Sequence, residues 1–506
     1  MTELFSLING LNQEEIKAVK YSFKKTGEDD DGLYLEELCS IILSARGKPI
    51  PDTELSIAIY SKEKLSAIAK LKSRLFQYIL EVLSSDAYLS KEQFFDPADK
   101  QIIRTRKKML QFRVLYRKKN KTDSIVLFHL LSEIIKEAKE YEQYDILIDA
   151  LYFKKTMLMI RKGFGEVKQI EKQIEYCQYS YKAFLKTADH YFEIISNQEL
   201  LQQTNPGRLK EMLREAITEM EEFIKNTDSA TIKYFCKQLQ LDEMIRENKH
   251  TNSIDTCLDI LNILNKHKHI YRGERVGVVY NNISICQVHR NDFDDAIASA
   301  QKAQEYYSEG SFNLMISKQQ EFLACFYGSS YNRAHTIVTD LLQFPVSNSG
   351  DFRHDKHLLF QASVLFKLGE YREALITGNK ALEVTKDKGR WDLGARYLRL
   401  LCMIELELHD PAYSAIEALR KALKRSEDGI TLRDELIYRA FNEFASTGFS
   451  NIPTPKLIEA LTELSLKDAA TSWQYYNHEM IPIHKWIESK ITLKTGVATS
   501  KVSGRR

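Results

Sequence analysis

A small side chain that recurs at a fixed distance after a helix-breaking residue constrains this sequence more than any other feature. In the stretch LFKLGEYREALITGNKALEV, residues 365–384, Gly369 interrupts an apolar helical pattern, and Ala374 and Ala381 follow it, seven residues apart. Alanines at that spacing lie two turns apart on one side of a helix, where a small side chain lets a neighbouring helix approach closely. The stretch therefore predicts two helices that pack together across a turn at Gly369.

The same register occurs in three other stretches of the chain. Each copy has a turn residue, an aromatic residue and two small or apolar residues: Asn291, Phe293, Ala296 and Ala303; Ser329, Tyr331, Ala334 and Leu341; Gly369, Tyr371, Ala374 and Ala381; and Asp410, Tyr413 (one place late), Ala415 and Ala422. The first alanines of successive copies are 38, 40 and 41 residues apart. Asn291 suits a turn because asparagine adopts the left-handed backbone conformation more readily than most residues. The sequence therefore predicts a stack of helical hairpins.

This pattern resembles the tetratricopeptide repeat (TPR) over about residues 271–426, a third of the chain. The family's unit has about 34 residues, so these units are four to seven residues longer and their curvature differs from the family average. The resemblance implies an all-α fold, a right-handed α-solenoid of helical hairpins. It also implies an inner groove that is lined by the first helix of each pair and binds a protein segment or peptide.

Seven side chains on the expected first helices are candidates for contact with such a peptide. They are Asn281, His289, Gln319, Tyr327, Lys356, Lys367 and Tyr397. Amide side chains both donate and accept hydrogen bonds, so they can pair with a peptide backbone, while aromatic side chains can hold apolar ones. The same residues can instead pack against the next turn of the superhelix, and the sequence leaves both interpretations open.

The rest of the chain is expected to be helical with different roles. We expect an N-terminal helical bundle over 1–95, a basic helical connector over 96–123, degenerate helical hairpins over 124–270, TPR-like repeats over 271–445, a C-terminal helical cap over 446–490 and a disordered basic tail over 491–506. Asn12 with Glu15 predicts a capping box, and Asn205 with Pro206 predicts a helix start. The N-terminal bundle fits either a cap or a helix-turn-helix-like module.

A basic run follows the N-terminal bundle. Residues 104–121 carry nine basic and no acidic side chains, with Phe112 and Tyr116 between them. Basic side chains bind phosphates and aromatic rings stack on bases, so the run is a candidate nucleic-acid surface. Its candidate residues are Arg104, Arg106, Lys107, Lys108, Arg113, Arg117 and Lys118. The alternative is a structural helix whose charge is offset by acidic neighbours such as KEAKEYEQYD, residues 136–145.

Composition narrows the class of protein. Lys and Arg number 72 and Asp and Glu 70, so no net charge draws the whole molecule to nucleic acid or to a membrane surface. The seven cysteines lack the close pairs of a zinc or dithiol site. No apolar run has the length of a membrane span, and the first residues lack the apolar segment of a signal peptide. We therefore expect a cytoplasmic protein.

No catalytic, cofactor or metal motif is recognisable. The pairs His267–His269 and His354–His357 lack the carboxylate or cysteine partners of a metal shell. No nucleophile and base can be paired by spacing, so we expect neither an enzyme nor a cofactor. The leading hypothesis is a non-enzymatic scaffold that binds a protein or peptide partner in the groove. The alternative is a regulator with a nucleic-acid-binding N-terminal region and a peptide-sensing array. The partner and the oligomeric state stay open.

Overall fold

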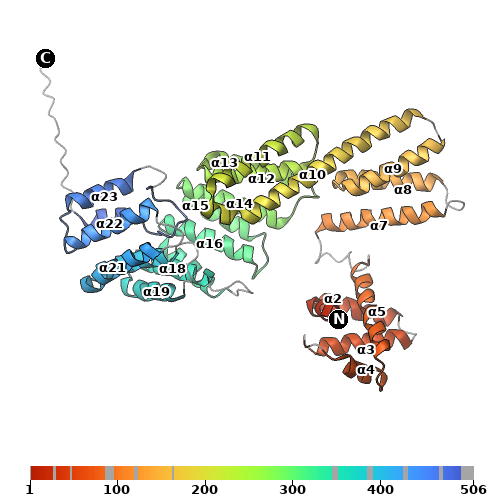
Figure 1. Ribbon diagram of the computed structural model, residues 1–506, viewed down its shortest axis with the longest axis horizontal. Coiled ribbons are helices and arrows are strands. Elements are labelled where there is room, and N and C mark those ends of the chain that lie inside the picture. Colours follow the sequence, from red (N-terminus) through yellow and green to blue (C-terminus); the bar gives the residue numbers. More distant parts are fainter. Residues whose placement is uncertain are drawn as a thin grey trace, which may run out of the picture. The chain divides into compact units, whose positions relative to one another are not determined.

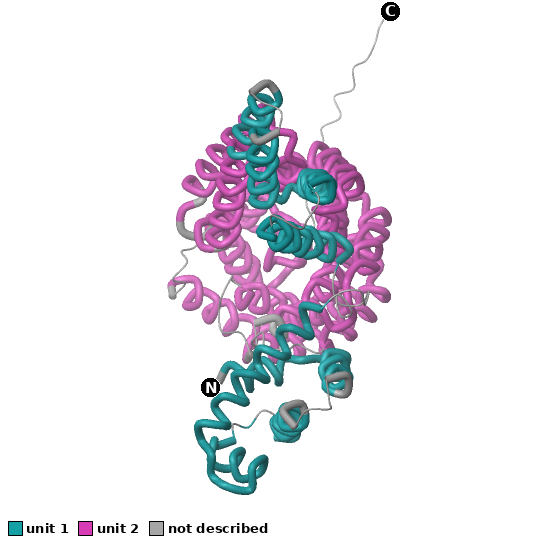
Figure 2. The backbone as a smooth tube through the Cα atoms, turned by 90° about the vertical axis from the view of Figure 1, so that its right-hand side faces the viewer, with its two compact units in different colours: residues 1–178 teal, residues 179–506 magenta. Residues whose placement is uncertain are grey.

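The computed structural model describes residues 2–26, 30–45, 48, 50–85, 96–118, 124–161, 164–344, 352–384, 391–425, 431–466 and 471–491, and among them it contains helices and no strand (Figure 1). The expectation of an all-α fold is confirmed for these residues. The chain forms two compact units, Met1–Gln178 and Tyr179–Arg506 (Figure 2). The expected six-part division is finer than this and stays a prediction, and most of the expected basic tail, residues 492–506, lies outside the described residues.

The first unit begins with a small bundle, which contains α1 (Thr2–Gly10), α2 (Gln13–Thr26), α3 (Asp30–Ser44), α4 (Asp52–Tyr60) and α5 (Leu65–Leu83). It continues with α7 (Pro97–Arg117), α8 (Ser124–Glu140) and α9 (Tyr144–Arg161), and α10 (Phe164–Thr204) begins in this unit. The capping box predicted at the start of α2 is confirmed. Asn12 Oδ1 accepts a hydrogen bond from the Glu15 N–H at 2.9 Å, and Glu15 Oε2 accepts one from the Asn12 N–H at 2.7 Å. Helices α1–α5 share an apolar core that includes Leu38, Ile42 and Ile68.

The second unit is a run of helical hairpins. After α10 it contains α11 (Pro206–Asn226), α12 (Ala230–Arg246), α13 (His250–Lys266), α14 (Gly273–His289), α15 (Phe293–Gln304), α16 (Phe312–Tyr327), α17 (Tyr331–Leu342), α18 (Phe352–Lys367), α19 (Tyr371–Val384), α20 (Trp391–Glu405), α21 (His409–Arg425), α22 (Leu432–Ser446), α23 (Pro455–Ser465) and α24 (Ile483–Lys490). From α11 onward, neighbouring helices pack in chain order. In addition, α14 packs against α16 and α18 packs against α20. We call α12, α14, α16, α18, α20 and α22 the first helices.

One backbone turn ends each first helix. The turn residue has a left-handed conformation, with φ between 58° and 83°, at Asn248, Asn291, Ser329, Gly369, Glu407 and Gly448. In each case the following residue donates its N–H to the carbonyl oxygen five positions earlier, at 2.8–3.1 Å. This is the hydrogen bond of the Schellman motif, which satisfies a carbonyl group that the helix end would otherwise leave unpaired. The turns predicted at Asn291, Ser329 and Gly369 are confirmed.

A small, fully buried residue follows five of these turns at a distance of five positions. These residues are Ser253, Ala296, Ala334, Ala374 and Ala412. The fourth predicted copy is wrong by three residues, because Glu407 rather than Asp410 has the left-handed backbone. Ala412 is the fully buried alanine of that copy, and Ala415 is only half-buried. Asp410 and Pro411 resemble a turn, but Pro411 lies in the first turn of α21, where its missing N–H leaves no helical bond unmade. With this correction, α12 to α23 form a TPR-like α-solenoid.

A non-helical segment separates α23 from α24. The described residues 471–482 contain no helix, and we call them the strap. Helices α23 and α24 belong to the expected C-terminal cover, whereas the strap runs back along the array. Its Tyr475 contacts Asn291, 184 positions earlier in the chain.

Candidate functional site

The strap lies against five successive first helices. The residues that it lies against are His289 on α14, Tyr327 on α16, Leu359 on α18, Tyr397 on α20 and Asp434 on α22. The face that these helices share is the one that the TPR resemblance predicts to be the binding groove. This face therefore holds a non-helical segment of the chain itself.

A glycine on α20 makes room for the strap. A Cβ atom at Gly394 would lie well inside van der Waals contact with the backbone carbonyl oxygen of His478. Gly394 is the fourth residue of α20, and glycine inside a helix is less stable than alanine by about 0.5–1 kcal/mol, so its presence there needs a packing reason. The strap backbone, which passes directly over α20 at this point, supplies that reason.

The tip of the strap, which we define as residues 473–477, places three aromatic rings on α14 and α16. The ring of Tyr327 lies 4.8 Å from that of Tyr475 and 5.7 Å from that of Trp473, measured between centroids. The ring of His289 lies 5.5 Å from those of both Tyr475 and Tyr476. Edge-to-face and tilted contacts at these separations are favourable for aromatic pairs. The tip is therefore held mainly by ring contacts.

Two hydrogen bonds accompany these contacts. The Tyr475 hydroxyl group donates to Asn291 Oδ1 at 2.5 Å, and the Tyr476 N–H donates to the Tyr327 hydroxyl oxygen at 3.3 Å. Asn291 thus has two roles, because it also forms the left-handed turn after α14. The second bond is made by the strap backbone, so it does not depend on which side chain stands at position 476.

The surface beneath the tip is uncharged at neutral pH. Burial, with a smaller contribution from His250, lowers the pKa of His289 to about 4. The two imidazole rings are stacked with their centroids 4.0 Å apart. Burial raises the pKa of Tyr327, which keeps its hydroxyl group protonated. With the neutral side chains of Asn291 and Phe293, these groups form a site for rings rather than for charged side chains.

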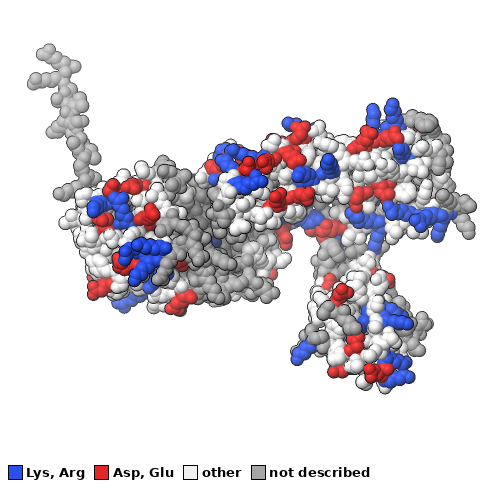
Figure 3. Space-filling view, viewed as in Figure 1, with Lys and Arg blue, Asp and Glu red and all other residues white. Residues whose placement is uncertain are grey.

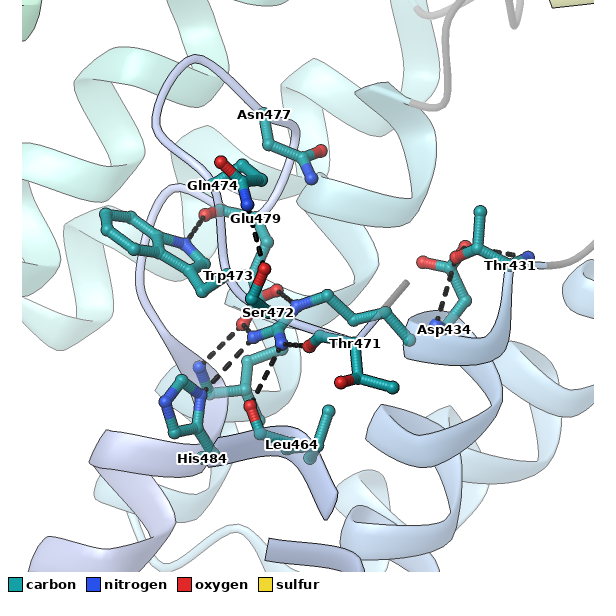
Figure 4. Close-up of polar contacts among 12 residues, drawn as sticks. Thr431, Asp434, Leu464, Thr471, Ser472, Trp473, Gln474, Asn477, Glu479 and His484 are labelled. Carbon is teal, nitrogen blue, oxygen red and sulfur yellow. Dashed lines mark hydrogen bonds and ion pairs between the residues drawn. The ribbon is translucent and has the colours of Figure 1, made fainter. Parts of the chain in front are cut away.

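A buried ion pair holds the strap next to the tip (Figure 4). Arg433 on α22 and Glu479 form a two-pronged contact, with Nε to Oε2 at 2.6 Å and Nη2 to Oε1 at 3.0 Å. Arg433 also donates to the carbonyl oxygen of Thr471, and Glu479 Oε1 accepts from the Ile483 N–H at 2.8 Å. Arg433 donates as well to His484 Nδ1 at 3.3 Å, and burial together with Arg433 lowers the pKa of His484 to about 4. We call this cluster the anchor.

A second buried carboxylate lies next to the anchor. Asp434 Oδ1 accepts from the Tyr397 hydroxyl group at 2.9 Å and lies 3.3 Å from His478 Nε2. Asp434 also forms the capping box of α22 with Thr431. Burial by itself would raise the pKa of Asp434, but the hydrogen bonds from His478, Thr431 and Tyr397 outweigh it and hold the pKa below its usual value. The start of α22 therefore binds the strap through two adjacent residues.

The structure brings together three of the seven predicted groove residues. His289, Tyr327 and Tyr397 lie along the strap. Asn281 and Gln319 are buried between helices, where Asn281 Oδ1 accepts from the Ser317 hydroxyl group at 2.9 Å and Gln319 Nε2 lies 2.6 Å from His357 Nε2. Lys356 lies over the ring of Trp391 at 4.7 Å, and burial lowers its pKa to about 8, while Lys367 is exposed at the end of α18.

The basic run is paired with acidic residues of neighbouring helices. Lys108 Nζ lies 2.5 Å from Glu137 Oε1 on α8. On α9, Asp145 pairs with Arg106 at 2.8 Å and Asp149 pairs with Arg113. Figure 3 accordingly shows blue and red side chains interspersed on the visible face of this unit. The other candidates are Lys107, which donates to the Ser84 carbonyl oxygen at 2.7 Å, and the exposed Arg104, Arg117 and Lys118.

The aromatic side chains of the basic run point into the protein. Phe112 is fully buried, and both Phe112 and Tyr116 pack on Phe153 with centroid separations of 5.1 Å. Their rings are therefore engaged within the unit rather than available for stacking on bases. Nucleic-acid binding stays a prediction from the charge of the run alone.

Sequence reasoning missed the strap and the anchor. The missed residues are Trp473, Tyr475, Tyr476, Glu479 and Arg433. Two signals were present: TSWQYYNHEMIP, residues 471–482, is rich in aromatic residues without helical periodicity, and Gly394 interrupts an otherwise good helical pattern. Neither signal says which helices the segment contacts.

Two general features complete the description. No helix within the described residues is long and apolar enough to cross a membrane. Over the same part of the chain, no group of three or more His, Cys, Asp or Glu side chains is placed to hold a metal ion.

Comparison with known proteins gives only distant structural similarity. No protein family and no curated protein matches the sequence. The apo form of the quorum sensor NprR from B. thuringiensis is 16% identical, with 63% of this chain and 86% of that chain covered and a TM-score of 0.44. The apo form of RapI is 11% identical, with 66% and 85% covered and a TM-score of 0.41. NprR in complex with its cognate peptide NprX is 16% identical, with 63% and 89% covered and a TM-score of 0.38. The assignment of a TPR-like fold rests on the turns and the buried small residues that recur in the helix pairs of this chain.

Proposed function

We propose that this chain is a cytoplasmic, non-enzymatic scaffold that binds an extended protein segment along the first helices of its solenoid. The observation that carries the proposal is the strap on that face. The strap is held by ring contacts, by one backbone hydrogen bond and by a carboxylate in a two-pronged ion pair. Proteins commonly hold extended peptides by these means.

The cysteines support the proposed location. All seven cysteines are buried and none forms a disulfide. Burial raises the pKa of thiols such as Cys236, to about 12, so they are protonated and unreactive at neutral pH. Small apolar cysteines of this kind are typical of proteins in a reducing compartment.

Site-specific photo-crosslinking of the full chain tests the proposal. Tyr327 is replaced by the photoreactive residue benzoyl-phenylalanine, and the protein is irradiated in the cells from which it comes. A matched control carries the same residue at Ile376, which is exposed on the second helix α19. We expect a covalent adduct with another protein at position 327 and none at position 376. If position 327 forms adducts only with the chain's own strap, the proposed function is wrong.

A further inference from the structure

The strap is attached in two different ways along its length. Residues 472–478 are all half-buried, whereas Glu479, Met480 and Ile481 are buried. On the buried side, Arg433 and Glu479 are both almost completely withdrawn from solvent and bind each other through two hydrogen bonds. On the half-buried side, the tip depends on ring contacts and on the two hydrogen bonds to Asn291 and Tyr327. The tip can therefore leave the array while the anchor stays in place.

The tip also carries two local features that disfavour its bound conformation. Tyr476 has a φ of 63°, a left-handed backbone conformation that is unfavourable for a bulky aromatic residue. Its hydroxyl group is buried and has no hydrogen-bond partner among the described residues. A buried polar group without a partner destabilises the state that contains it. The tip therefore fits its site less well than a ligand without these two defects would.

We propose that the tip is a displaceable internal ligand, and that the partner that displaces it is an extended protein segment with two neighbouring aromatic side chains. This inference rests on the proposed function and names its class of partner. The chemistry of the site carries the assignment: His289, Phe293 and Tyr327 offer ring faces and edges, and Asn291 Oδ1 offers an acceptor for a tyrosine hydroxyl group. The Tyr327 hydroxyl oxygen accepts a backbone N–H, which any segment can supply.

An internal ligand changes the affinity that a partner observes. The partner binds only the fraction of molecules whose tip has left the site, so its apparent dissociation constant is raised by the inverse of that fraction. Removing the two tyrosine rings of the tip weakens this competition without adding any contact to the partner. The proposal therefore predicts a gain of binding from a loss of side chains, which a purely structural role of the tip does not predict.

The test uses the full chain and a labelled synthetic peptide. The probe is fluorescein-labelled SWQYYNH, residues 472–478, and its binding is followed by fluorescence anisotropy. The tip variant carries Tyr475→Ala and Tyr476→Gly, which removes the two tyrosine rings, keeps Trp473 and tolerates the left-handed backbone at position 476. We expect the tip variant to bind the probe at least about tenfold more tightly than the unaltered protein does. Adding Tyr327→Ala to the tip variant should abolish the gain, and a probe with alanine in place of both tyrosines should not bind.

Hydrogen exchange of the unaltered protein provides a measurement that does not depend on a variant that folds. Backbone amides of residues 473–477 should exchange faster than those of residues 479–483, and excess unlabelled probe should speed the exchange of the tip further. Equal protection of the two segments would overturn the proposal. So would a folded tip variant, judged by circular dichroism, that binds the probe no better than the unaltered protein.

The outcomes separate this inference from the proposed function. If Tyr327 crosslinks to another protein in cells but the tip variant gains no affinity, the scaffold stands and the displaceable tip is wrong. If the tip variant gains affinity for the probe but position 327 crosslinks to no cellular protein, the tip is confirmed as a displaceable internal ligand. The proposal of an external protein partner is then wrong. If light scattering shows a dimer of the unaltered protein that the tip variant cannot form, the occupant is the tip of a second copy, and the proposed partner class is overturned.

Discussion

At the residue scale, the Arg433–Glu479 pair is a buried ionic contact between α22 and the strap. Both side chains are almost completely buried, so Glu479→Gln leaves the charge of Arg433 without compensation in a medium of low polarity. We expect this change to lower the free energy of unfolding by about 3–5 kcal/mol, measured by urea denaturation. Arg439 on α22 and Glu459 on α23 form a solvent-accessible pair, and Glu459→Gln should cost less than about 1 kcal/mol. Equal losses from the two changes would contradict a special role for the buried pair.

Gly394 makes a second prediction at this scale. Gly394→Ala places a methyl group against the His478 carbonyl oxygen, so we expect a loss of about 1–3 kcal/mol and faster proteolysis of the strap. Gly378 on α19 is the matched control, because a Cβ there would meet only the flexible Arg399 side chain, at 3.3 Å. Gly378→Ala should be neutral or should stabilise α19 by up to about 1 kcal/mol. A neutral Gly394→Ala would show that the strap does not pass over α20 as described.

At the scale of the element, the corrected register of the fourth repeat is open to a direct test. Ala412 is fully buried between helices, so Ala412→Leu overfills its site and should lower the free energy of unfolding by about 1–3 kcal/mol. Ala415 is half-buried on the same helix, and Ala415→Leu should have an effect below about 0.5 kcal/mol. Thermal unfolding of the two variants measures the difference. If Ala415→Leu lowered the stability more than Ala412→Leu, the register with Asp410 as the turn residue and Ala415 as the buried alanine would be the correct one.

The repeats were predictable from the sequence because their determinants are local. A turn residue and a small residue five positions later are visible within one hairpin, and three copies were assigned correctly. Ser253 occupies the same packing position after the turn at Asn248. This earlier copy of the repeat was not recognised in the sequence because it has a serine in place of the alanine. The fourth copy was placed three residues late, because the left-handed turn residue there is Glu407 rather than Asp410. The packing of each helix pair could therefore be anticipated wherever the residue types were typical of the family.

The site was only partly predictable because its determinants are not local. His289, Tyr327 and Tyr397 could be assigned to the inner face from the register of their own helices. Their partners come from the strap, whose Tyr475 pairs with a residue 184 positions away. No sequence periodicity relates two segments so far apart in the chain. An aromatic-rich stretch without a helical pattern does not indicate which helices it packs against. The occupant of the groove thus became visible only in three dimensions.

At the scale of the whole molecule, buried histidines predict sensitivity to acid. His289 and His484 have pKa values lowered from 6.5 to about 4, so the unfolded chain binds protons between these values while the folded protein does not. Stability should therefore fall as the pH decreases from about 6.5 to about 4. Asp434, whose pKa is held below its usual value, adds a loss at still lower pH, where the unfolded chain takes up its proton first.

Denaturation at a series of pH values checks this expectation. His289→Gln should flatten the profile between pH 6.5 and 4 by on the order of 1–2 kcal/mol, after allowance for the partial exposure of the ring. The control is His129→Gln, which replaces a largely exposed side chain of the first unit and should change the profile less than His289→Gln does. If the stability of His289→Gln still fell with the same slope between pH 6.5 and 4, His289 would not be a cause of the acid sensitivity.

The return of the strap from α23 to α14 has a consequence for synthesis on the ribosome. Solenoid repeats contact mainly their neighbours, so α12 to α22 can assemble one after another as the nascent chain emerges. The tip reaches its site only after residue 477 has left the exit tunnel, so the rings of His289 and Tyr327 stay uncovered while about 150 further residues are translated. Every newly made molecule therefore passes through a period in which the proposed protein partner can bind without competition from the tip.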